Sequence, residues 1–240
     1  MTKNLTVAAL AVAFALGGGW MLTRPDTSGA ALGTGQSLLP GAAIAQEATA
    51  TDDTAAAAVT IPEMAQGAED APVTIIEYAS YTCPHCANFH ANQYQNLKEY
   101  IADGRVRFIF REVYFDRFGL WASMITRCAG DPMRFFGLTD VLYDTQRDWI
   151  GEGEPATIAD NLRTIALTAG LEPAQVDACM QDQAKAEALI AWFEENATRD
   201  GIQATPTLFI NGEQYANMAW EDLAAIIDPI VEESGWTAAQ

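Results

Sequence analysis

Apolar residues along the chain follow strand-like spacing in some segments and helix-like spacing in others. The segment VTIIEYA, residues 73 to 79, is short, apolar and β-rich, which predicts a buried strand. Residues 84 to 101 carry larger apolar side chains at helical spacing and predict a helix that ends before Asp103-Gly104. Residues 106 to 115 alternate and predict another strand. This order of strand, helix and strand favours a parallel crossover unit.

The spacing becomes helical throughout residues 117 to 200, where apolar side chains recur three or four positions apart. Strand character returns in TPTLFINGEQY, residues 205 to 215, and the Asn211-Gly212 pair within it predicts a β-hairpin. A last helical pattern covers residues 220 to 232. We therefore expect an α/β fold with the order β-α-β, a helical insertion, and then β-β-α.

The N-terminal part has a different character. Lys3 precedes an uncharged apolar segment, residues 5 to 22, which is typical of a secretory signal or a membrane anchor. A small-residue cleavage site after Ala45 lies far beyond that segment, so cleavage and anchoring both stay open. We assign residues 1 to 22 to this signal peptide or anchor. Residues 23 to 60 are rich in Ala, Thr, Gly and Asp, which predicts a flexible linker in an exported protein.

The charge balance excludes one class of partner. The chain has 13 basic and 32 acidic residues, and its formal net charge is −19. Nucleic-acid binding needs clustered Lys and Arg side chains that contact phosphates, so we expect no nucleic-acid partner. Hydrophobic residues make up 50% of the 240 positions, which is enough to bury a substantial core.

Two cysteines that are two residues apart, in the sequence Cys83-Pro84-His85-Cys86, carry the candidate chemistry. A structural disulfide between them would close a very small loop, and the stabilising effect of a disulfide grows with loop length. A zinc or copper site is weakly supported, because a zinc site needs about four ligands and the chain has 2 histidines and no other Cys-x-x-Cys pair. A redox-active pair fits better.

A thiolate at the start of a helix lies near unpaired backbone N–H groups and the positive end of the helix dipole. Cys83 takes this place, so we expect its pKa to fall to about 3.5–7.5. Pro84 suits a first turn, His85 would lower the pKa further, and Cys86 would be the resolving cysteine. A pKa of ~4 would favour the reduced pair by roughly 4 kcal/mol, or about 90 mV, at pH 7. Such a pair is an oxidant.

Two other positions predict contacts with this pair. Glu77 interrupts an apolar strand, and a buried carboxylate is costly unless it is paired or functional. We expect it to accept or relay a proton for Cys86; the alternative is a strand end that reaches solvent. Thr205-Pro206 begins a later strand, where a cis peptide bond would turn the Thr205 backbone toward a substrate chain. An ordinary trans turn is the alternative.

The remaining cysteines, Cys128 and Cys179, fall on separate predicted helices. Cysteines of an exported protein are commonly paired. A bridge between these two would close a loop of about 50 residues and contribute up to ~4 kcal/mol. We expect a structural disulfide, with buried free thiols or a second redox pair as alternatives.

These motifs resemble those of the DsbA family of thiol oxidoreductases, within the thioredoxin superfamily. The resemblance rests on EYASYTCPHC, residues 77 to 86, and on TPTLFING, residues 205 to 212, and it extends from about residue 60 to the C-terminus. It implies a thioredoxin fold in two parts, residues 61 to 116 and 201 to 240, separated by the helical insertion.

The resemblance also implies an activity. It implies oxidation of reduced exported proteins in the bacterial periplasm, with no cofactor beyond the redox-active disulfide, and reoxidation by a membrane quinone-linked oxidase of the DsbB type. Cys83 would be the attacking cysteine, Cys86 the resolving one, His85 the tuning residue, Glu77 the buried acid and Pro206 a cis-proline. Threonine precedes that proline where the best-known oxidases have valine, and isomerase relatives also carry threonine. A reductase or isomerase of the same fold, and a metal-binding chaperone, are the alternatives.

Overall fold

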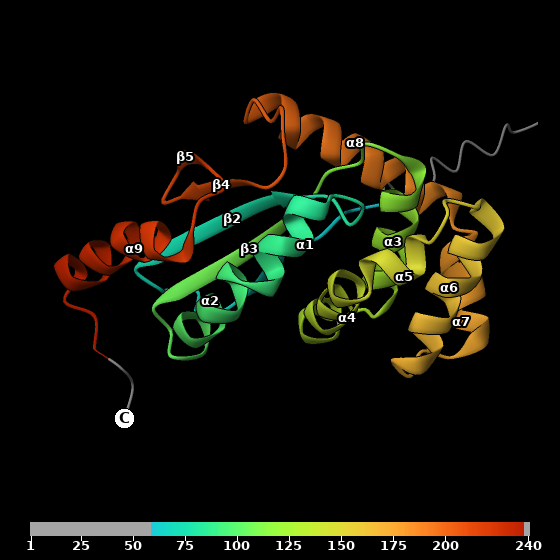
Figure 1. Cartoon of the computed structure of the whole chain (residues 1–240), viewed down its shortest axis with the longest axis horizontal. Helices are drawn as coiled ribbons and strands as arrows, with labels where there is room; N and C mark the ends of the chain where they lie inside the picture. The colour runs from blue at the N-terminus through green and yellow to red at the C-terminus, as the bar shows by residue number, and fades with distance from the viewer. Residues whose placement is uncertain (1–58, 238–240) are drawn as a thin grey trace, which may run out of the picture. The chain divides into compact units, whose positions relative to one another are not determined.

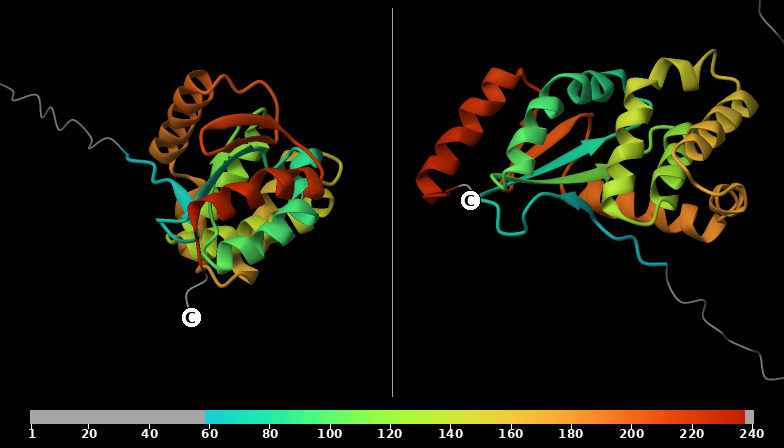
Figure 2. Two further views of the ribbon diagram at one scale, coloured as in Figure 1. Left: turned by 90° about the vertical axis from the view of Figure 1, so that its left-hand side faces the viewer. Right: turned by 90° about the horizontal axis from the view of Figure 1, so that it is seen from below.

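A five-stranded mixed sheet forms the centre of the computed structural model, which describes residues 59–237 (Figures 1 and 2). The strand order is β1-β3-β2-β4-β5. The strands are β1 (Met64–Gln66), β2 (Val73–Ala79), β3 (Val106–Glu112), β4 (Thr207–Ile210) and β5 (Glu213–Ala216). β2 and β3 are parallel, and the other neighbours pair antiparallel. The expected α/β fold and the parallel crossover are therefore confirmed.

β2 is the central strand of the sheet, and its apolar sequence explains this place. Ile75 and Ala79 are fully buried, as a strand with neighbours on both sides and helices beside it requires. Glu77 lies opposite Phe110 of β3 and Leu208 of β4, which are also fully buried. The carboxylate is therefore inside the sheet, and the alternative of a strand end that reaches solvent is wrong.

Three helices lie beside the sheet, and two of them, α2 (Gln93–Ala102) and α9 (Trp220–Ser234), contact each other (Figure 1). The third is α1 (Pro84–Ala91). The ring centroids of Tyr100 in α2 and Trp220 in α9 are 5.5 Å apart, and the Tyr100 hydroxyl donates to Asp228 at 2.8 Å. Leu223 and Ile227, four residues apart in α9, are fully buried, as the helical pattern predicted.

The segment predicted as one helix, residues 84 to 101, is two helices that meet at Asn92. The φ and ψ angles of Asn92, −120° and −77°, are not helical. Its side chain donates to the Asn88 carbonyl at 2.8 Å, and the Gln95 side chain donates to the His90 carbonyl at 2.8 Å. Side-chain amides thus replace backbone donors at the break. The prediction was wrong because the apolar spacing continues across this junction.

The chain between β3 and β4 is helical, as expected, and lies at the carboxyl ends of β2 and β3 (Figure 1). Its helices are α3 (Arg117–Cys128), α4 (Pro132–Asp144), α5 (Gln146–Ile150), α6 (Pro155–Thr168), α7 (Pro173–Met180) and α8 (Gln183–Arg199). Asp116, Asp131 and Asp182 precede α3, α4 and α8, and each carboxylate accepts a hydrogen bond from a backbone N–H of the first turn. These caps fix where the three helices begin.

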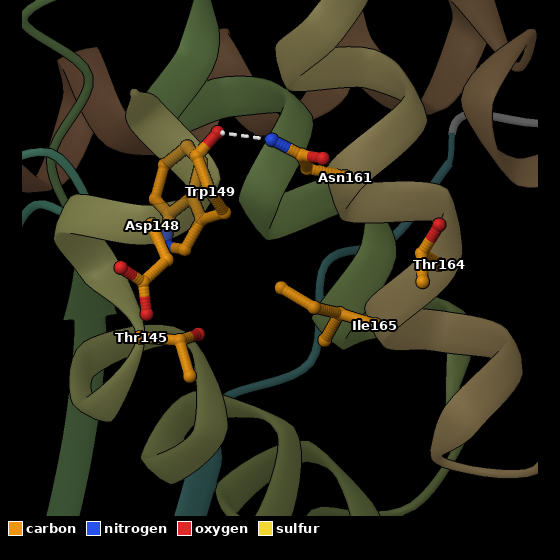
Figure 3. Close-up of a pocket in the computed structure, with 6 residues that line it drawn as sticks. All are labelled: Thr145, Asp148, Trp149, Asn161, Thr164 and Ile165. Carbon is orange, nitrogen blue, oxygen red and sulfur yellow. Dashed lines mark hydrogen bonds between the residues drawn. The ribbon is translucent and has the colours of Figure 1, made fainter.

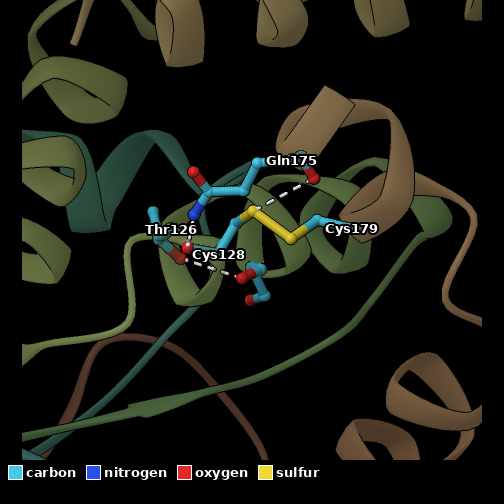
Figure 4. Close-up of a disulfide and its surroundings, with 5 residues drawn as sticks. Thr126, Cys128, Gln175 and Cys179 are labelled. Carbon is cyan, nitrogen blue, oxygen red and sulfur yellow. Dashed lines mark hydrogen bonds between the residues drawn. A yellow bond between two sulfur atoms is a disulfide. The ribbon is translucent and has the colours of Figure 1, made fainter. Parts of the chain in front are cut away.

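Cys128 in α3 and Cys179 in α7 form a disulfide, which is the pairing expected from the sequence (Figure 4). The two cysteines are 51 residues apart in the chain. Beside them, the Gln175 side chain donates to the Cys128 carbonyl at 2.8 Å. The bridge therefore joins the first helix of the insertion to one near its end.

The structure adds one strand that the sequence did not predict. β1 pairs antiparallel with β3, with Met64 opposite Phe110, and its three residues are too few for a periodic pattern to reveal. The expected signal peptide or anchor, residues 1 to 22, and the linker up to residue 58 lie outside the described residues. Within residues 59–237, no helix is both long and apolar enough to cross a bilayer.

Candidate active site

The two cysteines of the motif lie at the start of α1, Cys83 as the residue before the helix and Cys86 in its first turn. Cys83 is the residue before the helix, with an extended backbone, and Pro84 occupies the first turn. Cys83 is partly exposed, whereas Cys86 is fully buried, and both are free thiols in this structure. The position expected for an attacking cysteine is therefore the accessible one, and the position expected for the resolving cysteine is the covered one.

The surroundings of Cys83 lower its pKa from 9.0 to about 5. A hydrogen bond from the Cys86 thiol makes the largest contribution. Partial burial opposes it, and a hydrogen bond from the Thr205 side chain and the backbone N–H groups of Cys86 and His85 lower the pKa further. Each of these groups stabilises the thiolate. The acidity predicted from the helix position is thus present, with the resolving thiol as its main source.

His85 lowers the pKa of Cys83 through its backbone. The side chain is exposed, and within residues 59–237 no hydrogen bond or ion pair of its imidazole is present. The backbone N–H of His85 lowers the pKa of Cys83 as part of the helix N-terminus. The role predicted for the His85 imidazole stays a prediction, and the contribution seen here comes from the main chain.

Burial, its hydrogen bond to Cys83 and the charge of Glu77 raise the pKa of Cys86 well above its ordinary value. The Ser80 backbone opposes this shift. Desolvation penalises an ionised thiol, and a nearby carboxylate penalises it further. Cys86 therefore keeps its proton over a wide pH range in the reduced protein, whereas Cys83 loses its own.

The loop before β4 brings Thr205 to Cys83. The Thr205–Pro206 peptide bond is cis, and the Cys83 thiol donates to the Thr205 carbonyl at 3.5 Å. In this dithiol form the Thr205 hydroxyl is buried and has no hydrogen-bond partner within residues 59–237. It lowers the pKa of Cys83, so it becomes a donor when that sulfur ionises. The two segments singled out in the sequence therefore meet in space.

Glu77 forms a buried pair with His90. Glu77 Oε2 and His90 Nε2 are 2.9 Å apart, and both side chains are almost completely buried. The His90 ring lies among aromatic rings, with centroids of Tyr143 at 4.2 Å and Tyr94 at 4.5 Å. In the described part of the chain, Glu77 Oε1 and His90 Nδ1 have no hydrogen-bond partner. Glu77 acts on Cys86 through its charge, and no hydrogen bond joins the two within residues 59–237.

Two other contacts to the redox turn come from residues that the sequence did not single out. Asp116 accepts a hydrogen bond from the Thr82 hydroxyl at 2.7 Å. Its place before a helical pattern marks it as a helix cap, although not as a neighbour of the cysteines. Gln146 donates to the carbonyls of Tyr81 and Cys83. Nothing in the sequence indicates this contact, because the partners are more than 60 residues away.

The described residues offer no metal centre around this pair. In the stretch from residue 59 to 237, no group of three or more His, Cys, Asp and Glu side chains is placed to hold a metal ion.

Comparison with known proteins identifies the family of the chain. Its sequence matches the thioredoxin family over residues 59–229. The chain belongs to that family. A Rickettsia bellii protein named as a protein-disulfide oxidoreductase is 31% identical over 173 residues, 72% of this chain and 66% of that protein. Disulfide bond formation protein D of Bacillus subtilis is 27% identical over 167 residues, 64% of this chain and 69% of that protein.

Comparison with solved structures also finds proteins of this fold. The crystal structure of Wolbachia pipientis alpha-DsbA1 is 26% identical, matches 73% of this chain and 94% of its own, and superposes with a TM-score of 0.66. The thioredoxin fold and the resemblance to DsbA proteins are therefore confirmed. The chain spans between 61% and 66% of the length of the Rickettsia relatives.

Proposed function

We propose that the chain is a thiol:disulfide oxidoreductase, which donates a Cys83–Cys86 disulfide to reduced proteins. One observation supports this function above all: at the N-terminus of α1, Cys83 is accessible and acidic, whereas Cys86 is buried and resists ionisation. Two thiols that differ in this way suit the separate roles of exchange and resolution. The names of the relatives, protein-disulfide oxidoreductase and alpha-DsbA1, support the same activity.

The exchange proceeds in two displacements. A substrate thiolate attacks Cys83 Sγ in the oxidised pair, the bond to Cys86 breaks, and a mixed disulfide forms. Cys86 leaves as a thiolate into a site that raises its pKa, so it takes up a proton. A second substrate thiolate then attacks the substrate sulfur of the mixed disulfide, and Cys83 leaves as a stabilised thiolate. Two electrons pass from the substrate dithiol to the Cys83–Cys86 pair.

The acidity of Cys83 gives this exchange its direction. At pH 7, a pKa of about 5 in place of 9.0 favours the dithiol form by at most about 2.7 kcal/mol, equivalent to about 60 mV. Solvent screening of the partly exposed sulfur lowers that figure. The pKa of ~4 assumed from the sequence would have given about 90 mV. The effect on the reduction potential therefore has the predicted direction and is smaller than predicted. The reduced form remains favoured, which is the property of an oxidant.

Glu77 is the group through which Cys86 gains and loses its proton. Its charge raises the pKa of Cys86, so the two groups are electrostatically coupled. One carboxylate oxygen is held by His90, and the other has no partner within residues 59–237 and is available to a proton. The buried dyad therefore supports the role predicted for Glu77 from its place in the strand.

The protein acts outside the cytoplasm, in the periplasm, on reduced exported proteins, and a membrane oxidase of the DsbB type reoxidises it. The apolar segment after Lys3 supports export. A disulfide between Cys128 and Cys179, far from the redox pair in sequence, also supports an oxidising compartment. Cleavage and membrane anchoring are both compatible with this location.

Equilibration of the purified protein with glutathione buffers tests the proposal. We expect a potential well above the ~−270 mV of thioredoxin, and a value near thioredoxin would favour a reductase. The Cys86→Ala variant is expected to accumulate a mixed disulfide with a protein that contains a disulfide, because the Cys83 thiolate displaces one sulfur of that disulfide and no Cys86 thiol is present to resolve the new bond. Cys83→Ser should abolish exchange and leave the fold unchanged. Retained exchange in that variant, or tight stoichiometric metal binding by the reduced protein, would contradict the assignment.

A further inference from the structure

One side chain of the helical insertion reaches the turn that carries Cys83. Gln146, the first residue of α5, is only 6% exposed. Its Nε2 donates to the Tyr81 carbonyl at 2.8 Å and to the Cys83 carbonyl at 3.0 Å. A primary amide has two N–H donors, and each of them has one carbonyl here. Both hydrogen bonds of the group are therefore used on the backbone of the redox turn.

These two carbonyls belong to the segment that sets the direction of the Cys83 side chain. The Cys83 N–H donates to the Ser80 carbonyl at 3.0 Å and closes a turn, and the Cys83 carbonyl also accepts from Ala87 at 3.2 Å, the first bond of α1. Gln146 adds a donor on either side of Thr82. The backbone that joins the turn to the helix is thus held from inside the helix and from the insertion.

Gln146 lies at the junction between α4 and α5, and several hydrogen bonds hold this junction in place. The Trp149 indole is almost fully buried and donates to the Leu142 carbonyl at 2.8 Å. From α6, the Asn161 side chain donates to the Trp149 carbonyl at 3.2 Å (Figure 3). The backbone N–H of Trp149 donates to the Thr145 carbonyl at 3.0 Å. The amide of Gln146 is therefore presented by a rigid support and needs little ordering to reach its partners.

We propose that Gln146 is a positioning residue, which holds the backbone of Cys83 so that its sulfur lies at the N-terminus of α1. This inference rests on the proposed function. Gln146 does not contact the sulfur, and it acts through the main chain. A neutral amide suits this role, because a carboxylate would place lone pairs against two carbonyls, and an ammonium would add a charge beside the reactive sulfur.

Gln146→Met tests the proposal, because methionine is similar in length and has no N–H donor. We expect the apparent pKa of Cys83, followed by thiolate absorbance, to rise. The equilibrium constant for reduction by glutathione should fall about three- to tenfold, the equivalent of one net hydrogen bond. Gln175→Met is the matched control, since Gln175 makes a similar bond to the Cys128 carbonyl at the other disulfide (Figure 4). The control should change neither quantity.

The outcomes separate this inference from the proposed function. An unchanged pKa and glutathione equilibrium in folded Gln146→Met, with an acidic Cys83 in the wild type, would overturn the role of Gln146 alone. A wild-type Cys83 that ionises like free cysteine would overturn the proposed function and this inference with it. If Gln146→Met does not fold, Gln146→Asn replaces it; the amide is then one methylene too short, and the same shifts are expected.

Discussion

The single most consequential group in the molecule is the sulfur of Cys83, whose pKa is lowered from 9.0 to about 5. Unfolding between these pH values takes up a proton, because the unfolded thiol is neutral where the folded one is ionised. The stabilising effect is therefore fully present above about pH 9, falls as the pH is lowered, and is lost below about pH 5.

This dependence predicts a result for the reduced protein. Its free energy of unfolding, minus that of Cys83→Ser, should increase from about pH 5 to pH 8 with a slope of up to ~1.4 kcal/mol per pH unit. Denaturant titrations at several pH values measure the difference. Solvent screening of the partly exposed sulfur makes the slope smaller than this limit. A flat difference would mean that the folded protein does not stabilise the thiolate.

The side-chain hydroxyl of Thr205 also affects the pKa of Cys83. Thr205→Val keeps the shape of the side chain and removes the hydroxyl that lowers the pKa of Cys83. We expect the Cys83 pKa to rise by about one unit, because a hydrogen bond to a charged group contributes roughly 1.5 kcal/mol or more. The rate of alkylation against pH measures it. Thr164→Val, on the exposed side of α6, serves as the control and should leave the profile unchanged.

At the scale of elements, the sequence predicted those helices and strands whose bounds depend on the local spacing of apolar residues. The bounds of β2 were predicted as found, because an apolar β-branched run leaves few alternatives. The break at Asn92 was missed, since it depends on side-chain amides that substitute for backbone donors. The pairing of Glu77 with His90 was also missed. His90 lies four residues after Cys86, and that spacing does not indicate which strand residue it would meet.

The Glu77–His90 pair joins β2 to α1 and predicts a coupling between these elements. His90→Leu would leave a buried carboxylate without its partner, and we expect it to lower the free energy of unfolding by about 2–5 kcal/mol. The double variant Glu77→Leu/His90→Leu removes both groups and should recover a large part of that loss. Denaturant unfolding of the two single variants and the double variant measures the coupling. Additive losses would show that the pair contributes no interaction of its own.

At the scale of the whole molecule, the insertion contacts the redox turn through Gln146 and is also bonded to the sheet itself. Arg127 of α3 forms a fully buried ion pair with Glu112 at the end of β3, with hydrogen bonds of 2.6 and 2.7 Å. After α8, Asp200 accepts from the Tyr78 hydroxyl of β2, and Arg111 of β3 donates to the same carboxylate at 3.1 Å. The insertion therefore forms one folded unit with the sheet, and a change within it can reach the redox turn.

Removal of the Cys128–Cys179 disulfide tests whether a change in the insertion reaches the redox turn. The double variant Cys128→Ala/Cys179→Ala opens a loop between cysteines 51 residues apart, and we expect it to lose up to ~4 kcal/mol of unfolding free energy. The alkylation profile of Cys83 should stay the same, since the hydrogen-bond donors that lower the pKa of Cys83 are Cys86, the His85 N–H and Thr205, and none of them lies in α3 or α7. Denaturant unfolding and alkylation of the same sample measure both quantities. A shifted Cys83 profile would show that the bridge supports the redox centre through the insertion, whereas a stability loss alone would confine its role to holding α3 against α7.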